Sequence, residues 1–130
     1  MGEAALSVEF VGLAGAGKSP LSFRVAELIC AKGIPVRQPS YLLAHGLSRV
    51  ERIARKSAHV IREVALNPRY ACLSARAVAS SRQKVHRDYA KMIFNWFLVS
   101  SLLRRRTRDS GIELYDQGIF QALWSIGFGG

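Results

Sequence analysis

Three short runs of apolar residues, separated by longer segments with helical periodicity, organise the chain. The first run, Leu6–Val11, is rich in β-branched and aromatic residues and predicts a strand. The runs Ile34–Arg37 and Ile112–Asp116 predict a second and a third strand. Prolines 35 and 39 accompany the second run, and proline cannot supply a ladder hydrogen bond. The second strand is therefore expected at the edge of its sheet.

Helical spacing of apolar residues fills the rest of the chain. The first helix is predicted over Pro20–Lys32 and should end at Gly33. Ser48 is expected to cap a helix over Arg49–Leu66, which Asn67-Pro68 should end. The apolar stripe of this helix, opposite its arginines and lysines, consists of Val50, Ile53, Ala54, Val60, Ile61 and Val64. Further helices are predicted over Tyr70–Ser80, Arg82–Arg106 and Ile119–Phe128.

The most apolar stretch of the chain runs from Met92 to Leu103 between Lys91 and Arg104. It spans about 12 residues, whereas about 20 are needed to cross a bilayer. It is therefore interpreted as a helix buried in the core and not as a transmembrane segment. The core candidates on its helix are Tyr89, Met92, Ile93, Trp96, Phe97 and Leu103.

Length and composition indicate one α/β domain over residues 1–130. A chain of 130 residues is too short for two ordinary domains, and 49% apolar residues suffice for a globular core. The first residues lack the basic and apolar regions of a signal peptide. Cys30 and Cys72 are isolated thiols without metal-site spacing, so a reduced, cytoplasmic protein is expected.

Residues Gly12 to Ser19 read G-L-A-G-A-G-K-S, a complete G-x-x-x-x-G-K-[ST] phosphate-binding loop between a predicted strand and a predicted helix. Glycines 12, 15 and 17 are expected to let the backbone turn its N–H groups toward a phosphate. Lys18 would reach the β- and γ-phosphates of ATP, and the Ser19 hydroxyl would bind Mg²⁺. The predicted ATP-binding residues are Gly12, Ala14, Gly15, Ala16, Gly17, Lys18, Ser19 and Pro20.

The third predicted strand ends in a carboxylate, Asp116. In addition to the loop, phosphate-loop proteins need an acidic group that holds the water shell of Mg²⁺ in place. In kinases such a group can also accept the proton of the attacking hydroxyl. Asp116 is therefore predicted as a catalytic residue together with Lys18, and as a metal-binding residue together with Ser19. The alternative is that Asp116-Gln117-Gly118 is only a turn.

The net charge of +10 suits a polyanionic ligand, whether nucleotide, nucleic acid or anionic lipid. The cations are scattered and no aromatic-interleaved nucleic-acid motif is present, so nucleic acid is not the favoured partner. Arg104, Arg105, Arg106 and Arg108 either complement a helix C-terminus or contact phosphate. The three histidines share no metal-ligand spacing and are read as helix-surface residues.

The segments V-E-F-V-G-L-A-G-A-G-K-S at 8–19 and L-Y-D-Q-G-I-F-Q-A-L-W-S at 114–125 resemble small P-loop kinases of the thymidylate kinase type, and less closely those of the adenylylsulfate kinase type. The resemblance implies a three-layer α/β/α P-loop NTPase fold with a parallel sheet, and a Mg-ATP-dependent phosphotransferase. Gln117 stands where thymidylate kinases carry arginine, which disfavours thymidylate as the acceptor.

The resemblance also implies five parallel strands, a lid and a base-binding loop, whereas the sequence supplies three strands and a helix-rich middle. The domain is therefore expected to be incomplete after its third strand, with an exposed edge that favours homo-oligomers. Three functions remain open: a kinase acting on an unidentified small-molecule acceptor, a nucleotide-binding regulatory module without turnover, and a basic nucleic-acid-binding protein.

Overall fold

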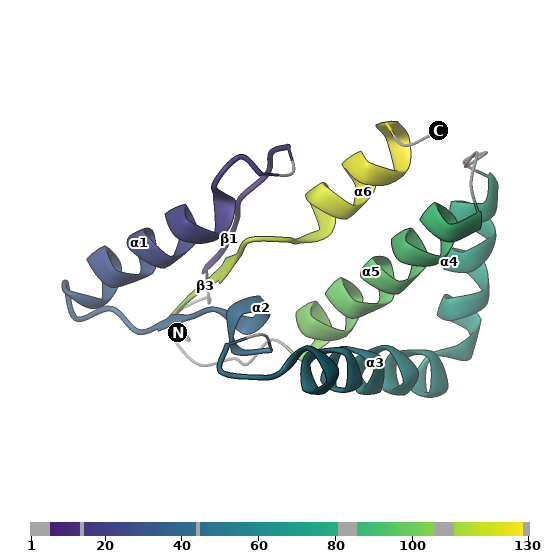
Figure 1. Ribbon diagram of the computed structural model, residues 1–130, viewed down its shortest axis with the longest axis horizontal. Helices are drawn as coiled ribbons and strands as arrows, with labels where there is room; N and C mark the ends of the chain where they lie inside the picture. Colours follow the sequence, from purple (N-terminus) through teal and green to yellow (C-terminus); the bar gives the residue numbers. More distant parts are fainter. Residues whose placement is uncertain (1–5, 14, 44, 81–85, 106–110, 129–130) are drawn as a thin grey trace, which may run out of the picture.

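The chain folds as an α/β protein in which a small parallel sheet lies beside a group of long helices (Figure 1). The computed structural model describes residues 6–13, 15–43, 45–80, 86–105 and 111–128. Within these residues the strands are β1 (Leu6–Glu9), β2 (Val36–Arg37) and β3 (Ile112–Tyr115). The helices are α1 (Lys18–Cys30), α2 (Pro39–Leu42), α3 (Arg49–Leu66), α4 (Pro68–Ser80), α5 (His86–Arg104) and α6 (Ile119–Phe128).

The last strand of the sequence lies in the middle of the sheet. The strand order is β1-β3-β2, and β3 pairs in parallel with both neighbours. Glu9 of β1 is in register with Tyr115 of β3, and Phe10 N–H donates to the Tyr115 carbonyl at 2.8 Å. Strand β2 lies at an edge, as the flanking prolines predicted. Because the strands are parallel, the carboxyl ends of β1 and β3 meet at the same side of the sheet.

The predicted elements are present, with shifted ends and one addition. Helix α1 begins two residues before Pro20, and α4 begins at Pro68 instead of Tyr70. The additional element is the single turn α2, which begins at Pro39, a favourable first residue of a helix. The predicted ends of the fifth helix, residues 82–85 and 106, lie outside the described residues.

The capping box predicted in part by Ser48 is complete. The Ser48 hydroxyl accepts from Glu51 N–H at 3.3 Å, and the Glu51 carboxylate accepts from Ser48 N–H at 2.8 Å. Hydrogen bonds from Ser48 to the carboxylate lower the pKa of Glu51 below its ordinary value. Both groups satisfy N–H donors that the first turn of a helix leaves without partners, which fixes where α3 begins.

The core lies where α5 passes the end of the sheet. Every residue from Phe97 to Leu102 on α5 is buried, so this part of the helix is covered on all sides. Leu98 and Leu102 pack with Leu43 and with Tyr115 of β3. Because successive residues of a strand point to opposite faces, burial of both Leu114 and Tyr115 shows that both faces of β3 are covered. Among the described helices, none is both long and apolar enough to span a membrane.

The apolar stripe predicted to bury α3 faces outward, which corrects the sequence interpretation. Val50, Ile53 and Ile61 are 76%, 56% and 68% exposed, and Val64 is 37% exposed. Of the predicted stripe, Val60 packs against the core cluster. The side of α3 that faces α5 is determined by polar contacts between the two helices. The spacing of apolar residues does not indicate where such contacts form.

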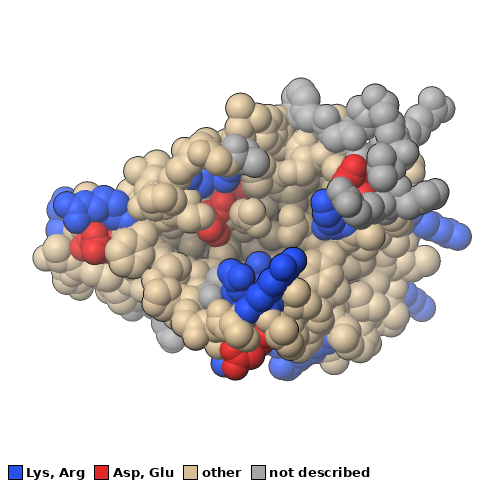
Figure 2. Space-filling view, in the orientation of Figure 1, with Lys and Arg blue, Asp and Glu red and all other residues tan. Residues whose placement is uncertain are grey.

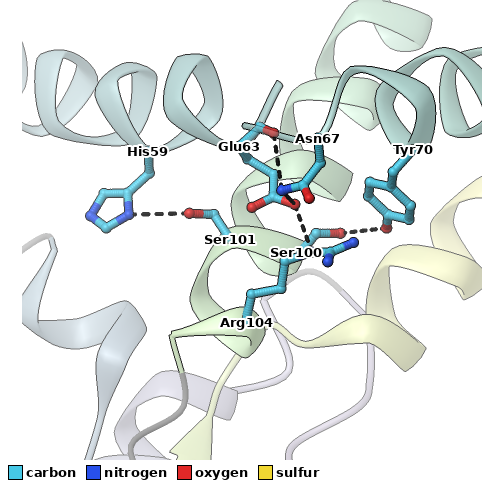
Figure 3. A network of polar contacts seen from close by, with 7 residues as sticks. All are labelled: His59, Glu63, Asn67, Tyr70, Ser100, Ser101 and Arg104. Carbon is cyan, nitrogen blue, oxygen red and sulfur yellow. Dashed lines mark hydrogen bonds and ion pairs between the residues drawn. The ribbon is translucent and has the colours of Figure 1, made fainter. Parts of the chain in front are cut away.

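Those polar contacts join the ends of α3, α4 and α5 (Figure 3). Glu63, which is 5% exposed, accepts from Arg104 Nε at 2.7 Å and from Asn67 Nδ2 at 3.2 Å. The Arg104 guanidinium also lies 4.6 Å from the centre of the Tyr70 ring. Arg104 therefore has a structural partner on α3 and another on α4.

Two further hydrogen bonds in the same network use buried serines of α5. The Tyr70 hydroxyl lies 2.9 Å from Ser100 Oγ, and His59 Nδ1 lies 3.4 Å from Ser101 Oγ. Burial lowers the pKa of His59, and the nearby Arg105 and Arg62 lower it further. His59 is thus a half-buried residue between α3 and α5 and not simply a helix-surface group.

Candidate functional site

The G-x-x-x-x-G-K-S segment forms a loop between β1 and α1 at the carboxyl end of the sheet. Gly15 and Gly17 have φ of 80° and 74°, the left-handed region that glycine adopts without steric cost. Gly17 is the N-cap residue of α1. Gly12 does not need this conformation, and a Cβ there would meet Ala16 Cβ and Lys18 Cδ at 3.8 Å. The loop is therefore shaped by its second and third glycines.

The N-terminal end of α1 has no side-chain cap, because Gly17 has no side chain to offer. The first N–H groups of a helix have no partners within it and attract anions. Helix α3, in contrast, satisfies the same groups with its own capping box. Pro20 lies exposed in the first turn of α1 and has no N–H to donate. Of the predicted loop residues, Ala14 lies outside the described part.

The Lys18 side chain folds back over the loop. Its Nζ donates to the carbonyl oxygens of Gly12 and Leu13, each at 2.7 Å. Both acceptors are backbone oxygens of the first two residues of the motif. The ammonium group is therefore held beside the loop by neutral acceptors, and its charge is not cancelled by a carboxylate in these bonds.

The second predicted group reaches the loop as well. Ser19 Oγ donates to Asp116 Oδ2 at 2.8 Å, although the two residues are 97 positions apart in the sequence. Ser19 belongs to the first turn of α1, and Asp116 directly follows β3. The contact exists because β3 lies next to β1, which brings the end of β3 beside the loop. A hydroxyl and a carboxylate thus converge at the mouth of the loop.

Glu9, the last residue of β1, caps helix α6. Its Oε1 accepts from Gly118 N–H at 3.1 Å and Gln121 N–H at 2.8 Å, and its Oε2 accepts from Phe120 N–H at 3.1 Å. A carboxylate at a helix N-terminus is favourable because it meets the positive end of the helix dipole. Gln121 in turn accepts from Gly12 N–H through Oε1 at 3.0 Å. These bonds fasten α6 to the start of the loop.

Gly118 is the residue that permits this arrangement, and its replacement by alanine is expected to destabilise the protein by about 2–3 kcal/mol. A Cβ at position 118 would overlap the Glu9 side chain at Cδ and Oε2. The carboxylate would have to leave the N–H groups of α6 or the turn would have to shift. Urea unfolding monitored by circular dichroism measures the change in free energy.

Gly127→Ala is the matched control, because it makes the same substitution inside α6, the helix that Gly118 precedes, at a position where a Cβ meets nothing within 4 Å. It should leave stability unchanged or raise it by about 0.5–1 kcal/mol, since alanine favours a helix over glycine. Equal stabilities of the two variants would show that Gly118 is not needed for the approach of Glu9.

A trough continues from the loop along α5 and α6. Its first compartment, of about 160 Å³, is lined by Lys18, Gln117, Gln121 and Asn95, among others. A second compartment of about 220 Å³ shares Asn95, Ala122 and Ser125 with the first and extends to Lys91. The space-filling view shows this face of the molecule hollowed between the α1 side and the side of α3 and α5 (Figure 2). A small molecule in the trough would lie next to Lys18.

Sequence reasoning missed Glu9, Gln121 and Asn95 as parts of this site. Nothing in their local patterns distinguishes them, because each becomes relevant only when α5 and α6 lie beside the loop. Within the described residues, no group of three or more histidine, cysteine, aspartate or glutamate side chains could hold a metal ion. Ser19 and Asp116 could therefore contribute only two protein ligands, with the remaining positions left to phosphate and water.

Comparison with known proteins adds no family to this description. No family model matches the chain, and neither does any curated protein or solved structure.

Proposed function

We propose that this chain is a P-loop protein of the three-layer α/β/α type that binds Mg-ATP on Gly12–Ser19 and transfers its terminal phosphate to a small molecule in the trough. The observation that carries the proposal is the 2.8 Å contact between Ser19 and Asp116. It brings together the serine and the carboxylate that Mg-dependent phosphate loops require, from two distant parts of the sequence.

The roles follow from the geometry of the loop. The uncapped N–H groups of α1 bind the phosphates, and Lys18 exchanges its carbonyl acceptors for phosphate oxygens. Ser19 and Asp116 would hold Mg²⁺, which would neutralise charge on the β- and γ-phosphates. The neutral acceptors of Lys18 matter here, because a lysine already paired with a carboxylate would have less to gain from phosphate.

The trough supplies the place for an acceptor. Its first compartment is bounded by Lys18 and by the amides of Asn95, Gln117 and Gln121, which can orient hydrogen-bonding groups. In the transfer, an acceptor oxygen forms a bond to the γ-phosphorus while the bond to the bridging oxygen of ADP breaks. Asp116 is placed to accept the proton that the acceptor hydroxyl releases.

Isothermal titration with a series of adenine nucleotides tests the proposal. ATP and ADP in the presence of Mg²⁺ should bind at least about tenfold more tightly than AMP, because only they present phosphates to both the helix N-terminus and Lys18. Chelation of Mg²⁺ should weaken ATP binding. Equal affinities for ATP and AMP would contradict phosphate recognition by the loop.

A further inference from the structure

The outward face of α3 carries both exposed branched apolar side chains and exposed arginines. Its exposed branched residues Val50, Ile53, Ile61 and Val64, here called the outer stripe, lie within about a quarter of the helix circumference at 3.6 residues per turn. The stripe spans 15 residues of an 18-residue helix, about 21 Å at 1.5 Å per residue. Contiguous exposed apolar surface of this kind marks an interaction site.

The charge around the stripe is almost wholly positive. Arg49 projects about 40° beyond one border of the stripe. Beyond the other border the exposed side chains of Ala54, Ala58 and Ala65 continue the apolar surface for about 60°, and Arg62 and Arg55 follow about 100–120° from the stripe. The side chains of Arg49, Arg55 and Arg62 are exposed, as is that of Arg52. Of the two acids of α3, Glu63 is buried against Arg104 and Glu51 is engaged in the capping box. The exposed surface of α3 is therefore apolar in the middle and cationic at its borders.

We infer that α3 docks on the surface of an anionic lipid bilayer, with the outer stripe in the acyl–headgroup boundary and the arginines among the lipid phosphates. An interfacial helix needs an apolar face and basic borders, and α3 has both. Branched aliphatic side chains insert shallowly, so attraction to anionic lipid must supply part of the binding. The inference does not depend on nucleotide binding, because no residue of α3 lies in the phosphate loop.

Charge favours a membrane over the other partners for this face. Pairing of two copies through the outer stripe would bring their bordering arginines together in a chain of net charge +10, and this repulsion opposes self-association. Nucleic acid would attract the arginines but would leave the outer stripe in water, because its phosphate surface offers no apolar contact. An anionic bilayer satisfies both parts of the face.

Co-sedimentation of the full chain with vesicles tests the inference. The probes are vesicles of phosphatidylcholine alone and vesicles of equimolar phosphatidylcholine and phosphatidylglycerol. We expect binding to the anionic vesicles that falls as salt is added, and little binding to the neutral ones. The double variant Ile53→Ser/Ile61→Ser should lower the partition coefficient roughly tenfold or more, since buried methylene groups drive insertion.

Two further variants separate the contributions. Arg55→Gln/Arg62→Gln keeps the outer stripe and should also weaken binding to anionic vesicles. Leu21→Ser/Leu28→Ser on α1 removes two leucines that are 54% and 55% exposed and should bind as the unaltered chain does. Circular dichroism confirms that each variant is folded.

Four results would overturn the inference. They are a failure of the unaltered chain to bind the anionic vesicles, equal binding to both kinds of vesicle, full binding by the folded isoleucine variant, and an equal loss of binding in the α1 control. Analytical ultracentrifugation without lipid adds a fifth, a dimer that the isoleucine changes dissociate, because the outer stripe would then be the interface between two copies.

Discussion

Replacing Lys18 by alanine should lower the affinity for Mg-ATP by about two orders of magnitude. Hydrogen bonds between a charged group and phosphate are each worth about 1.5–3 kcal/mol, and every 1.4 kcal/mol corresponds to a factor of ten. The Lys18 ammonium lies at the loop and is bonded to two carbonyl oxygens that a phosphate can replace. Isothermal titration of the variant with Mg-ATP gives the change directly.

The control for this variant is Lys32→Ala, which removes an exposed lysine just beyond the end of α1 and the same unit of charge. It should change the affinity less than about twofold, because an exposed charge at such a distance is screened by salt. Thermal unfolding of both variants shows whether loss of the Lys18 bonds also loosens the loop. An unchanged affinity in Lys18→Ala would exclude the loop as the ATP site.

Replacing Asp116 by asparagine should leave ATP bound but should lower the rate of γ-phosphate loss by roughly a hundredfold or more. An amide oxygen can still accept the hydrogen bond from Ser19, so the geometry of the loop should be retained. What is lost is a negative charge for the metal shell and a base for the acceptor proton, and general-base catalysis alone is worth about 10²–10⁴-fold. ADP formation, measured alongside ATP affinity, separates the two effects.

Glu27→Gln makes the same carboxylate-to-amide change on the exposed side of α1, where Glu27 forms an ion pair with Arg24. It should leave both ATP affinity and ADP formation unchanged. If the unaltered chain binds ATP but forms no ADP with any acceptor offered, the phosphotransferase proposal is wrong. The nucleotide-binding module without turnover, one of the open alternatives, would then account for the loop.

The succession of strands and helices along the chain could be predicted from the sequence, because the signals that define each element are local. Ser48 identifies the start of α3 through its own hydrogen bond, and the proline-flanked run around Val36 identifies an edge strand. The backbone conformation of the loop Gly12–Ser19 could likewise be predicted from its residues, since Gly15 and Gly17 adopt the positive φ that glycine allows. Asp116 was predicted beside the loop because β3 had to end there for the motif to function.

What could not be predicted depends on which surfaces meet. The periodicity of α3 indicated a buried apolar stripe, but the helix is turned by Glu63 and His59, whose partners Arg104 and Ser101 lie on α5. A polar residue that becomes buried by finding a partner looks the same in sequence as one that stays in water. The positions of apolar residues alone therefore do not indicate which side of such a helix packs against the rest of the protein.

The capping of α6 by Glu9 has an electrostatic consequence for the sheet edge. Helix α1 begins after β1 and helix α6 begins after β3, and these two strands are neighbours in the sheet. The N-terminus of each helix would offer a partial positive charge to an anion. The carboxylate of Glu9 accepts from the N–H groups of α6 and acts as their counter-ion, whereas Gly17 gives α1 no side-chain cap and the Asp116 carboxylate at that end accepts from the Ser19 hydroxyl. If the loop binds phosphate as proposed, the incoming phosphate meets one uncapped helix end instead of two, and this difference directs it to the loop.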